Sequence, residues 1–439
     1  MANRIYLCLA HMSEAGLEQK YIQEAFDTNW VAPLGPNVNG FEEDLKAFVG
    51  QGKEVVALTT GTAAVHLSLI ACGVEPGDEV ITQSFTFCAS AHPVTYLGAT
   101  PVFVDSEKET WNMDPDLLEE ANKDRIAKTG KKPKVIMPVA LYGMPYQIDR
   151  ILEIANRYDI PVVEDAAEGF GSRYDGQVLG TFGRYGILSF NGNKMITTSG
   201  GGALICPNKE EGDRVMWYAT QARESYPYYQ HETIGYNYRM SNICAGIGRG
   251  QMTIVNEHIA HHQHVHQLYV ELFSKIDGIE VHSQPANGRY ASNYWLTSIT
   301  IDEGLKIKGQ ENAYKEIITS PVGGVPAVIH AASSARTDCQ PNDNVEALRM
   351  ALEKAGIESR PLWKPMHKQP VYCRTNEKLG MRNEELSHGI IRQTSATSVA
   401  YVNGVSENIF KKGMCLPAGP WVKDEDVKRI VETIKANII

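Results

Sequence analysis

The stretch that decides the fold is TTGTAAVHLSLIACGVEPGDEVITQ, residues 59–83. Its first half contains a long apolar segment, residues 62–73, whose length and small initial residues predict a helix. The short run EVITQ at 79–83 follows and predicts a buried strand. A helix that leads directly into an apolar strand is the repeating unit of an α/β protein.

The same alternation continues along the chain to about residue 206. A second helix is predicted at 147–159, and further strands are predicted at 100–105, 134–139, 160–165, 186–190 and 201–207. Strands that are apolar along their whole length indicate a buried, mostly parallel central sheet flanked by helices. In such sheets ligands bind at the carboxyl ends of the strands.

Beyond this region the pattern changes. Residues 239–276 predict a long helical stretch, and the shorter, mixed pattern after residue 280 predicts a strand at 293–301 and a helix at 344–357. We therefore expect a large domain at 1–275 and a smaller C-terminal α+β domain at 276–439. Residues 302–342 are polar and rich in Gly, Ser and Pro, which is typical of an insertion or long loop.

Composition excludes several classes of protein. The 439 residues carry a formal net charge of −10, and no Lys/Arg block is present, so nucleic acid is not an expected partner. No run of 18 apolar residues occurs, so no membrane span is expected. The eight cysteines are scattered without a C-x-x-C pair, as in reduced cytoplasmic proteins. We expect a cytoplasmic protein.

Polar residues fall where ligands would bind. Gly61, Thr62 and Ala63 begin a helix, whose unpaired N–H groups could hold a phosphate, although a simple helix cap is the commoner reason for such residues. Phe87 follows a strand and could stack on a flat ring or belong to the core. Asp165 ends a buried strand, where it could face a ligand or cap a helix.

SFNGNKMITTSGGG, residues 189–202, adds Ser189 and one lysine, Lys194, at the end of another strand. Pyridoxal phosphate needs a lysine for a Schiff base, a carboxylate for its pyridine nitrogen, an aromatic face and a phosphate cup. At about 4 Å and an effective dielectric of about 20, that carboxylate would be worth roughly 4 kcal/mol to the pyridinium. The residues at these strand ends supply each part.

Several segments then resemble the DegT/DnrJ/EryC1/StrS aminotransferases, which are fold-type I pyridoxal phosphate enzymes. The resemblance covers about residues 17–420 and is carried by TTGTAAVHLSL, VVEDAAEGFGS, SFNGNKMITTSGGG, GYNYRMSNICAGIG, PLWKPMHKQPVY and MCLPAGP. The segments at 29–45 and 403–419 are most similar to the branch that aminates C4 of UDP-linked 4-keto-6-deoxy-N-acetylhexosamines.

This resemblance implies a role for each site residue. Lys194 would form the Schiff base and carry protons, Asp165 would bind the pyridine nitrogen, and Phe87 would stack on the ring. Thr62, Ala63 and Ser189 would hold the phosphate with the Gly61 turn. Asn237 resembles the family residue that reaches a phosphate across the subunit boundary, which implies a homodimer with shared active sites.

One position departs from the family pattern. Many members have glutamine where this chain has Glu168, and that glutamine contacts the cofactor's phenolic oxygen. An ionised glutamate there would be repelled, so we expect Glu168 to contact the cofactor in a protonated form or to turn away. Relatives that dehydrate sugars carry histidine at the lysine position, so Lys194 favours transamination.

The reaction implied is the transfer of an amino group from an amino acid, by resemblance L-glutamate, to the C4 ketone of a nucleotide-linked keto-sugar. Alternatives are amination at C3 of a dTDP-3-keto-6-deoxyhexose and a catalytically silent binding protein. A dinucleotide-dependent oxidoreductase would need a glycine fingerprint between strand and helix, and none is found. The sugar diphosphate needs cationic or N–H donors, for which Arg239 and His367 are the candidates, and Trp30 could pack on a ring of the substrate; each of the three could equally be structural.

His258, His262 and His266 share one face of the long helical stretch. Three histidines at this spacing could chelate a metal, but a solvated helix face is the commoner arrangement. No metal is predicted.

Overall fold

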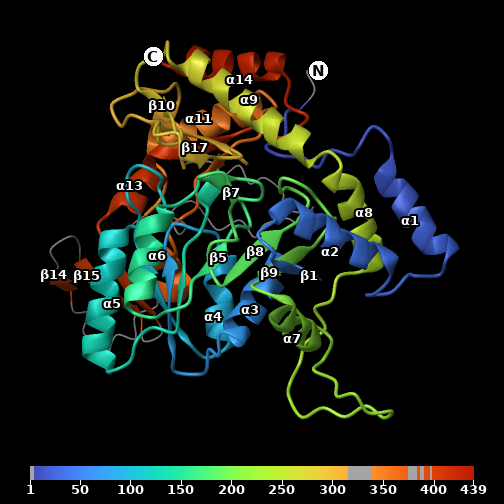
Figure 1. Cartoon of the computed structure of the whole chain (residues 1–439). Coiled ribbons are helices and arrows are strands. Elements are labelled where there is room, and N and C mark those ends of the chain that lie inside the picture. Colours follow the sequence, from blue (N-terminus) through green and yellow to red (C-terminus); the bar gives the residue numbers. More distant parts are fainter. Residues whose placement is uncertain (1–3, 315–338, 374–382, 386–389, 396–397) are drawn as a thin grey trace.

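The computed structural model describes residues 4–314, 339–373, 383–385, 390–395 and 398–439 (Figure 1). The predicted parallel sheet is present. Its first part has the order β16-β3-β2-β4, with neighbouring strands parallel in these four: β16 (Ser398–Val402), β3 (Thr100–Val104), β2 (Glu79–Gln83) and β4 (Val135–Met137). These strands are apolar because helices cover them on both sides.

The sheet continues through two parallel bridges, Ile136 with Val162 and Val139 with Asp165. They lead to β5 (Val163–Asp165) and β8 (Tyr185–Ser189), which are parallel. The next strand, β9 (Gly202–Cys206), is antiparallel to β8, and the last, β1 (Glu54–Leu58), is antiparallel to β9 and so runs in the direction of β8. The carboxyl ends of β2, β5 and β8 therefore meet at one edge of the molecule's main sheet.

Helices surround this sheet. Its flanking helices are α2 (Pro36–Val49), α3 (Gly61–Ala71), α4 (His92–Tyr96), α5 (Pro115–Thr129), α6 (Ile148–Arg157) and α7 (Lys209–Ala219). The long helical stretch predicted at 239–276 divides into α8 (Asn242–Met252) and α9 (Val255–Phe273), and α8 packs with α1 (Leu17–Asp27). Ser241 caps the amino-terminal end of α8, because its hydroxyl oxygen accepts the Ile243 N–H at 3.3 Å.

A second, antiparallel sheet has its own hydrophobic core. Its strands are β10 (Ile279–Val281), β12 (Thr297–Ile301), β17 (Gly413–Leu416) and β13 (Arg360–Pro361), and it is covered by α9, α11 (Asp343–Lys354) and α14 (Asp424–Asn437). This matches the small α+β character expected of the C-terminal part. The exact boundary at 275/276 stays a prediction.

One part of the C-terminal half departs from the expected division. Strand β16 lies beside β3, so residues 398–402, which we assigned to the C-terminal domain, belong to the main sheet. Helix α13 (Val405–Lys412) then returns the chain to the second sheet. Of the expected insertion at 302–342, only 302–314 and 339–342 fall within the described residues, and they include the short helix η3 (Gln310–Asn312).

Smaller elements complete the described part of the chain: η1 (Cys88–Ser90), η2 (Leu141–Gly143), β6 (Arg173–Tyr174), β7 (Gln177–Val178), β11 (Tyr290–Ala291), η4 (Met366–Lys368), α12 (Pro370–Cys373), β14 (Asn383–Glu385) and β15 (Ile390–Ser395). All eight cysteines are free thiols. Within the described ranges, every helix is too short or too polar to cross a bilayer.

Candidate active site

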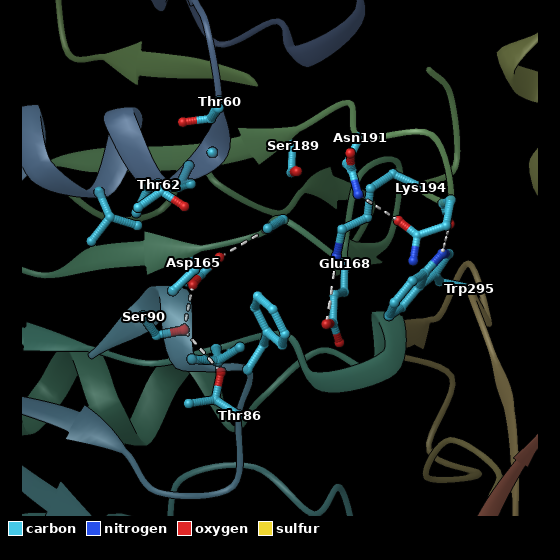
Figure 2. Close-up of a pocket in the computed structure, with 18 of the residues that line it drawn as sticks. Thr60, Thr62, Thr86, Ser90, Asp165, Glu168, Ser189, Asn191, Lys194 and Trp295 are labelled. Atoms are coloured by element: carbon cyan, nitrogen blue, oxygen red, sulfur yellow. Dashed lines mark hydrogen bonds and ion pairs between the residues drawn. The ribbon is translucent and has the colours of Figure 1, made fainter. Parts of the chain in front are cut away.

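A cavity of about 240 Å³ opens where the carboxyl ends of β2, β5 and β8 meet the start of α3 (Figure 2). It gathers most of the residues singled out from the sequence. Those that line it are Gly61, Thr62, Phe87, Asp165, Glu168, Ser189 and Lys194. In Figure 2 the start of α3 and Lys194 lie on opposite sides of the cavity, with Asp165 between them.

The start of α3 forms one end of the cavity. Thr60 caps the helix, because its hydroxyl oxygen accepts the Ala63 N–H at 2.9 Å. Ala63 is buried and does not line the cavity, so the lining residues of this turn are Thr60, Gly61 and Thr62. A Cβ added to Gly61 would lie 3.0 Å from Ser189 Cβ. Glycine therefore lets the first turn approach Ser189, and helix-terminal N–H groups favour an anion there.

Asp165 lies at the middle of the cavity floor, almost fully buried. Ser90 Oγ donates to its Oδ2 at 2.6 Å, and the Ala167 N–H donates to Oδ1 at 3.1 Å. Burial raises the pKa of the Asp165 carboxyl, while the Ser90 hydrogen bond opposes that rise. A cationic partner would favour its ionised form.

The hydroxyl of Ser90 lies 2.9 Å from that of Thr86, so the carboxylate has two layers of support. Our sequence interpretation missed both residues. Both residues follow β2, within the stretch SFTFCAS (84–90). Small hydroxyl residues directly after a strand of a parallel sheet could have indicated that they lie at the ligand site.

Lys194 lies at the opposite end, with only 14% of its side chain exposed. Its Nζ lies 3.5 Å from Glu168 Oε1 and 4.1 Å from the centre of the Trp295 ring. Glu168 Oε2 accepts the Tyr142 N–H at 2.7 Å. Burial raises the pKa of the Glu168 carboxyl, and the charge of Lys194 opposes that rise. Glu168 therefore lines the cavity and faces the lysine, and its contact with the cofactor stays a prediction.

Two candidates for binding the sugar diphosphate are instead held inside the protein. The buried Arg239 forms an ion pair with Glu42 and donates to the Ala57 carbonyl at 3.0 Å. The buried His367 contacts Ser84 Oγ at 2.6 Å and Glu407 Oε1 at 3.0 Å. The nitrogens of both side chains therefore bind other groups of the protein, and neither side chain lines the cavity.

The other two candidates outside the cavity lie on the surface. Trp30 is 41% exposed, in the loop between α1 and α2. Asn237 is also exposed, and it lies in the segment between α7 and α8 that bridges back to Thr220. Within one chain, therefore, neither reaches the cavity.

The three histidines of α9 that share one face are not solvated, so that expectation is wrong. His258, His262 and His266 are all buried. They contact the Met195 carbonyl at 3.0 Å, the Tyr294 carbonyl at 3.2 Å and Ser283 Oγ at 3.0 Å, respectively. Over the ranges that the structure describes, no group of His, Cys, Asp or Glu has metal-binding geometry.

Comparisons with known proteins identify the family. The DegT/DnrJ/EryC1/StrS aminotransferase family matches residues 13–319. The chain belongs to this family. It is 40% identical over 434 residues to EpsN of Bacillus subtilis, named as a pyridoxal phosphate-dependent aminotransferase, covering 99% of this chain and 96% of EpsN. It is 31% identical over 429 residues to the GDP-perosamine synthase of Escherichia coli O157:H7, covering 98% of each.

Solved structures agree. A DegT/DnrJ/EryC1/StrS aminotransferase from Brucella abortus superposes with a TM-score of 0.76 at 25% identity, over 96% of this chain and 95% of that one. The family assignment confirms the predicted α/β fold, the aminotransferase activity and the pyridoxal phosphate cofactor.

The cavity of this aminotransferase fits that cofactor. The tight approach of Gly61 to Ser189 leaves a helix start and a hydroxyl at one end, where a phosphate is the matching group. Asp165 is a buried carboxylate whose hydrogen-bond donors, among the residues that the structure describes, are the neutral Ser90 hydroxyl and Ala167 N–H, so a pyridinium nitrogen suits it as a cationic partner. Lys194 places one primary amine opposite the helix start.

Proposed function

We propose that this aminotransferase transfers the amino group of L-glutamate to the C4 ketone of a nucleotide-linked 4-keto-6-deoxy sugar, of the UDP-N-acetyl type. The proposal is supported by the full-length similarity to GDP-perosamine synthase, whose name is that of a sugar-modifying enzyme. The observation that carries it is the position of Lys194, buried in the cavity beside Glu168 and facing the Asp165 floor.

Each end of the cavity has a separate task. The N–H groups of Gly61 and Thr62, with the Ser189 hydroxyl, hold the cofactor phosphate; Asp165 holds the pyridine nitrogen, and Phe87 covers the ring. Bound pyridoxal phosphate supplies a carbonyl carbon that captures amines and a protonated ring that draws electrons from the reacting carbon.

Lys194 is the acid and base of both half-reactions. It removes the proton from Cα of glutamate, and in the second half it delivers a proton to C4 of the sugar. The apolar Trp295 and Trp363 flank the cavity and limit the access of water to the amine. Glu168 keeps the amine at the wall of the cavity, within reach of both substrates in turn.

The working unit proposed is a homodimer. Among the residues that the structure describes, Lys194 is the only cationic side chain lining the cavity, yet both substrates are anions. The segment between α7 and α8 projects from the body in Figure 1 and exposes Tyr226, Tyr228 and Tyr229. A second copy can cover these aromatic rings and bring Asn237 and a cation to the cavity of its neighbour.

The substrate is tested with purified protein, pyridoxal phosphate and ¹⁵N-glutamate. Keto-sugars linked to UDP, GDP and dTDP, with the ketone at C3 or C4, are offered separately, and products are detected by mass spectrometry. We expect ¹⁵N at C4 of the UDP-N-acetyl sugar and no product with Lys194→Ala. Exclusive labelling of a 3-keto sugar would contradict the proposal, and cofactor uptake without any product would favour a silent binding protein.

Shared sites are tested by mixing two inactive variants, Lys194→Ala and Asn237→Ala, after mild dissociation. If Asn237 serves the neighbouring site, each hybrid dimer contains one intact site, and activity returns to about a quarter of wild type, because half of the dimers are hybrids with half of their sites intact. A mixture as inactive as its components, or a monomeric wild type by light scattering, would exclude this arrangement.

A further inference from the structure

One indole makes two different contacts with the catalytic lysine. Trp295 is 1% exposed and precedes β12 in the second sheet, not in the main one. Its Nε1 donates to the carbonyl of Asn193, the residue before Lys194, at 2.6 Å. Its ring face lies 4.1 Å from Lys194 Nζ (Figure 2). The same side chain therefore holds both the backbone and the amine of the lysine.

A buried asparagine links the backbone of Trp295 to the backbone of Glu168. Asn293 Oδ1 accepts the backbone N–H of Trp295 at 2.9 Å, and its Nδ2 donates to the backbone carbonyls of Glu168 at 2.9 Å and Phe170 at 3.0 Å. Asn293 is fully buried, so these bonds do not compete with water. The backbone positions that carry the two partners of the lysine amine, one ring and one carboxylate, are thereby linked to each other.

This arrangement matters most while the amine is free. A lysine side chain has four rotatable bonds, and ordering it costs up to about 2 kcal/mol. A ring face attracts an ammonium group, and a pinned backbone shortens the path that the amine can sweep. Glu168 alone, at 3.5 Å, fixes a distance but not a direction.

We propose that Trp295 is the positioning residue for Lys194, holding its released amine on the indole face beside Glu168 so that it transfers protons in both half-reactions. This role rests on the proposed function and deepens it. Because Trp295 directly precedes β12 of the second sheet, the C-terminal part of the chain takes part in the lysine's alignment. The cofactor contacts proposed above, in contrast, come from the main sheet and from the loops and the helix start beside it.

The test compares Trp295→Phe, which keeps a ring face but loses the N–H, with Trp295→Leu, which loses both. Trp421→Phe is the matched control, because Trp421 Nε1 also donates to a backbone carbonyl, that of Ala10 at 2.9 Å, but its side chain is exposed and lies outside the cavity. Proton removal is measured in single turnovers with glutamate and α-deuterated glutamate. The visible circular dichroism of the bound cofactor provides a readout without turnover.

We expect the single-turnover rate to fall about 5-fold in Trp295→Phe and about 30-fold or more in Trp295→Leu, with an increased deuterium isotope effect and a weaker dichroic band. The glutamate concentration for half-maximal rate stays within about twofold, because Trp295 acts on the lysine and not on binding. Should Trp295→Leu fail to fold, Trp295→Phe still carries the comparison.

Rates, isotope effects and dichroism in both variants equal to those of Trp421→Phe would overturn the role of Trp295 while leaving the proposed function intact. A wild-type protein that binds the cofactor but cannot convert it with glutamate would overturn the proposed function, and this role with it.

Discussion

Glu168 Oε1 lies 3.5 Å from Lys194 Nζ, and the two side chains share a buried wall of the cavity. In sequence they are separated by the whole of β8 and the segments on either side of it. The contact gives the lysine an anionic neighbour in addition to Asp165 on the floor. Asp165 and Glu168 have different hydrogen-bond donors, so the two carboxylates can act on two different nitrogens: Asp165 on that of the cofactor ring and Glu168 on that of the lysine.

The variant Glu168→Gln tests this division. Its amide oxygen can still accept the Tyr142 N–H, so we expect normal folding and cofactor uptake and a change in kcat of no more than about tenfold. Burial raises the pKa of Glu168, so the wild-type carboxylate is lost early as pH falls. The acid side of the kcat/KM profile should contain one ionisation that is missing from the variant. Superimposable profiles would show that this charge is not used.

Substitution of Gly61 by alanine tests the phosphate end. The added Cβ would press on Ser189 Cβ at 3.0 Å, and overpacking of this kind costs about 1–3 kcal/mol. We expect the dissociation constant for pyridoxal phosphate to rise about tenfold or more, measured by absorbance titration. Gly192→Ala, in the lysine loop but with its nearest neighbour 3.9 Å away, is the control and should bind normally. Equal affinities of Gly61→Ala and Gly192→Ala for pyridoxal phosphate would show that the phosphate does not bind at Gly61.

Arg239 should be needed for stability and not for substrate. Removing one partner of a buried ion pair leaves the other uncompensated, so Arg239→Met should lower the free energy of unfolding by about 3–5 kcal/mol. Adding Glu42→Gln, which can still accept the Ala57 N–H, should restore most of this loss. Urea unfolding measures both variants. A large rise in KM for the sugar, with unchanged stability, would show that Arg239 binds the substrate.

The buried histidines of α9 should make the fold sensitive to acid. Burial lowers the pKa of His262 to about 3, against an ordinary value of about 6.5. Between these values the unfolded chain binds a proton that the folded chain does not, so stability is complete above pH 6.5 and is lost as pH falls. The loss is about 1.4 kcal/mol per pH unit from this residue.

Unfolding in urea at pH 7, 6 and 5 measures this loss. The variant His262→Gln should show a shallower dependence of stability on pH than wild type, whatever its stability at pH 7. His231→Gln is the control and should keep the wild-type slope, because His231 is exposed and contacts the backbone carbonyl of Gln221 and not a carboxylate. Parallel slopes for all three proteins would contradict the assignment.

Local features of the sequence predicted much of this molecule. The strands at 79–83 and 100–105 and the helix at 62–73 agree with β2, β3 and α3 within a residue or two, because continuous apolar runs mark a buried parallel sheet. The same runs place Asp165, Ser189 and Lys194 at strand ends, and parallel strands bring their ends together. The pyridoxal phosphate chemistry thus followed from residue types and order along the chain.

Contacts between distant segments were not predictable in this way. Arg239 and His367 carry the chemistry of phosphate ligands, but only the fold pairs them with Glu42 and Glu407. His258, His262 and His266 are spaced like a solvated stripe, but only the fold places Met195, Tyr294 and Ser283 against them and buries them.

The sequence by itself determined that a lysine, a carboxylate and a helix start would meet at one edge of a parallel sheet, since strand direction follows from local pattern. Only the tertiary structure decided that Glu168 faces the lysine and that Trp295 holds it. Those two relations depend on how loops and a second sheet pack across long sequence separations, and the packing is decided by the sum of many weak contacts that no short stretch encodes.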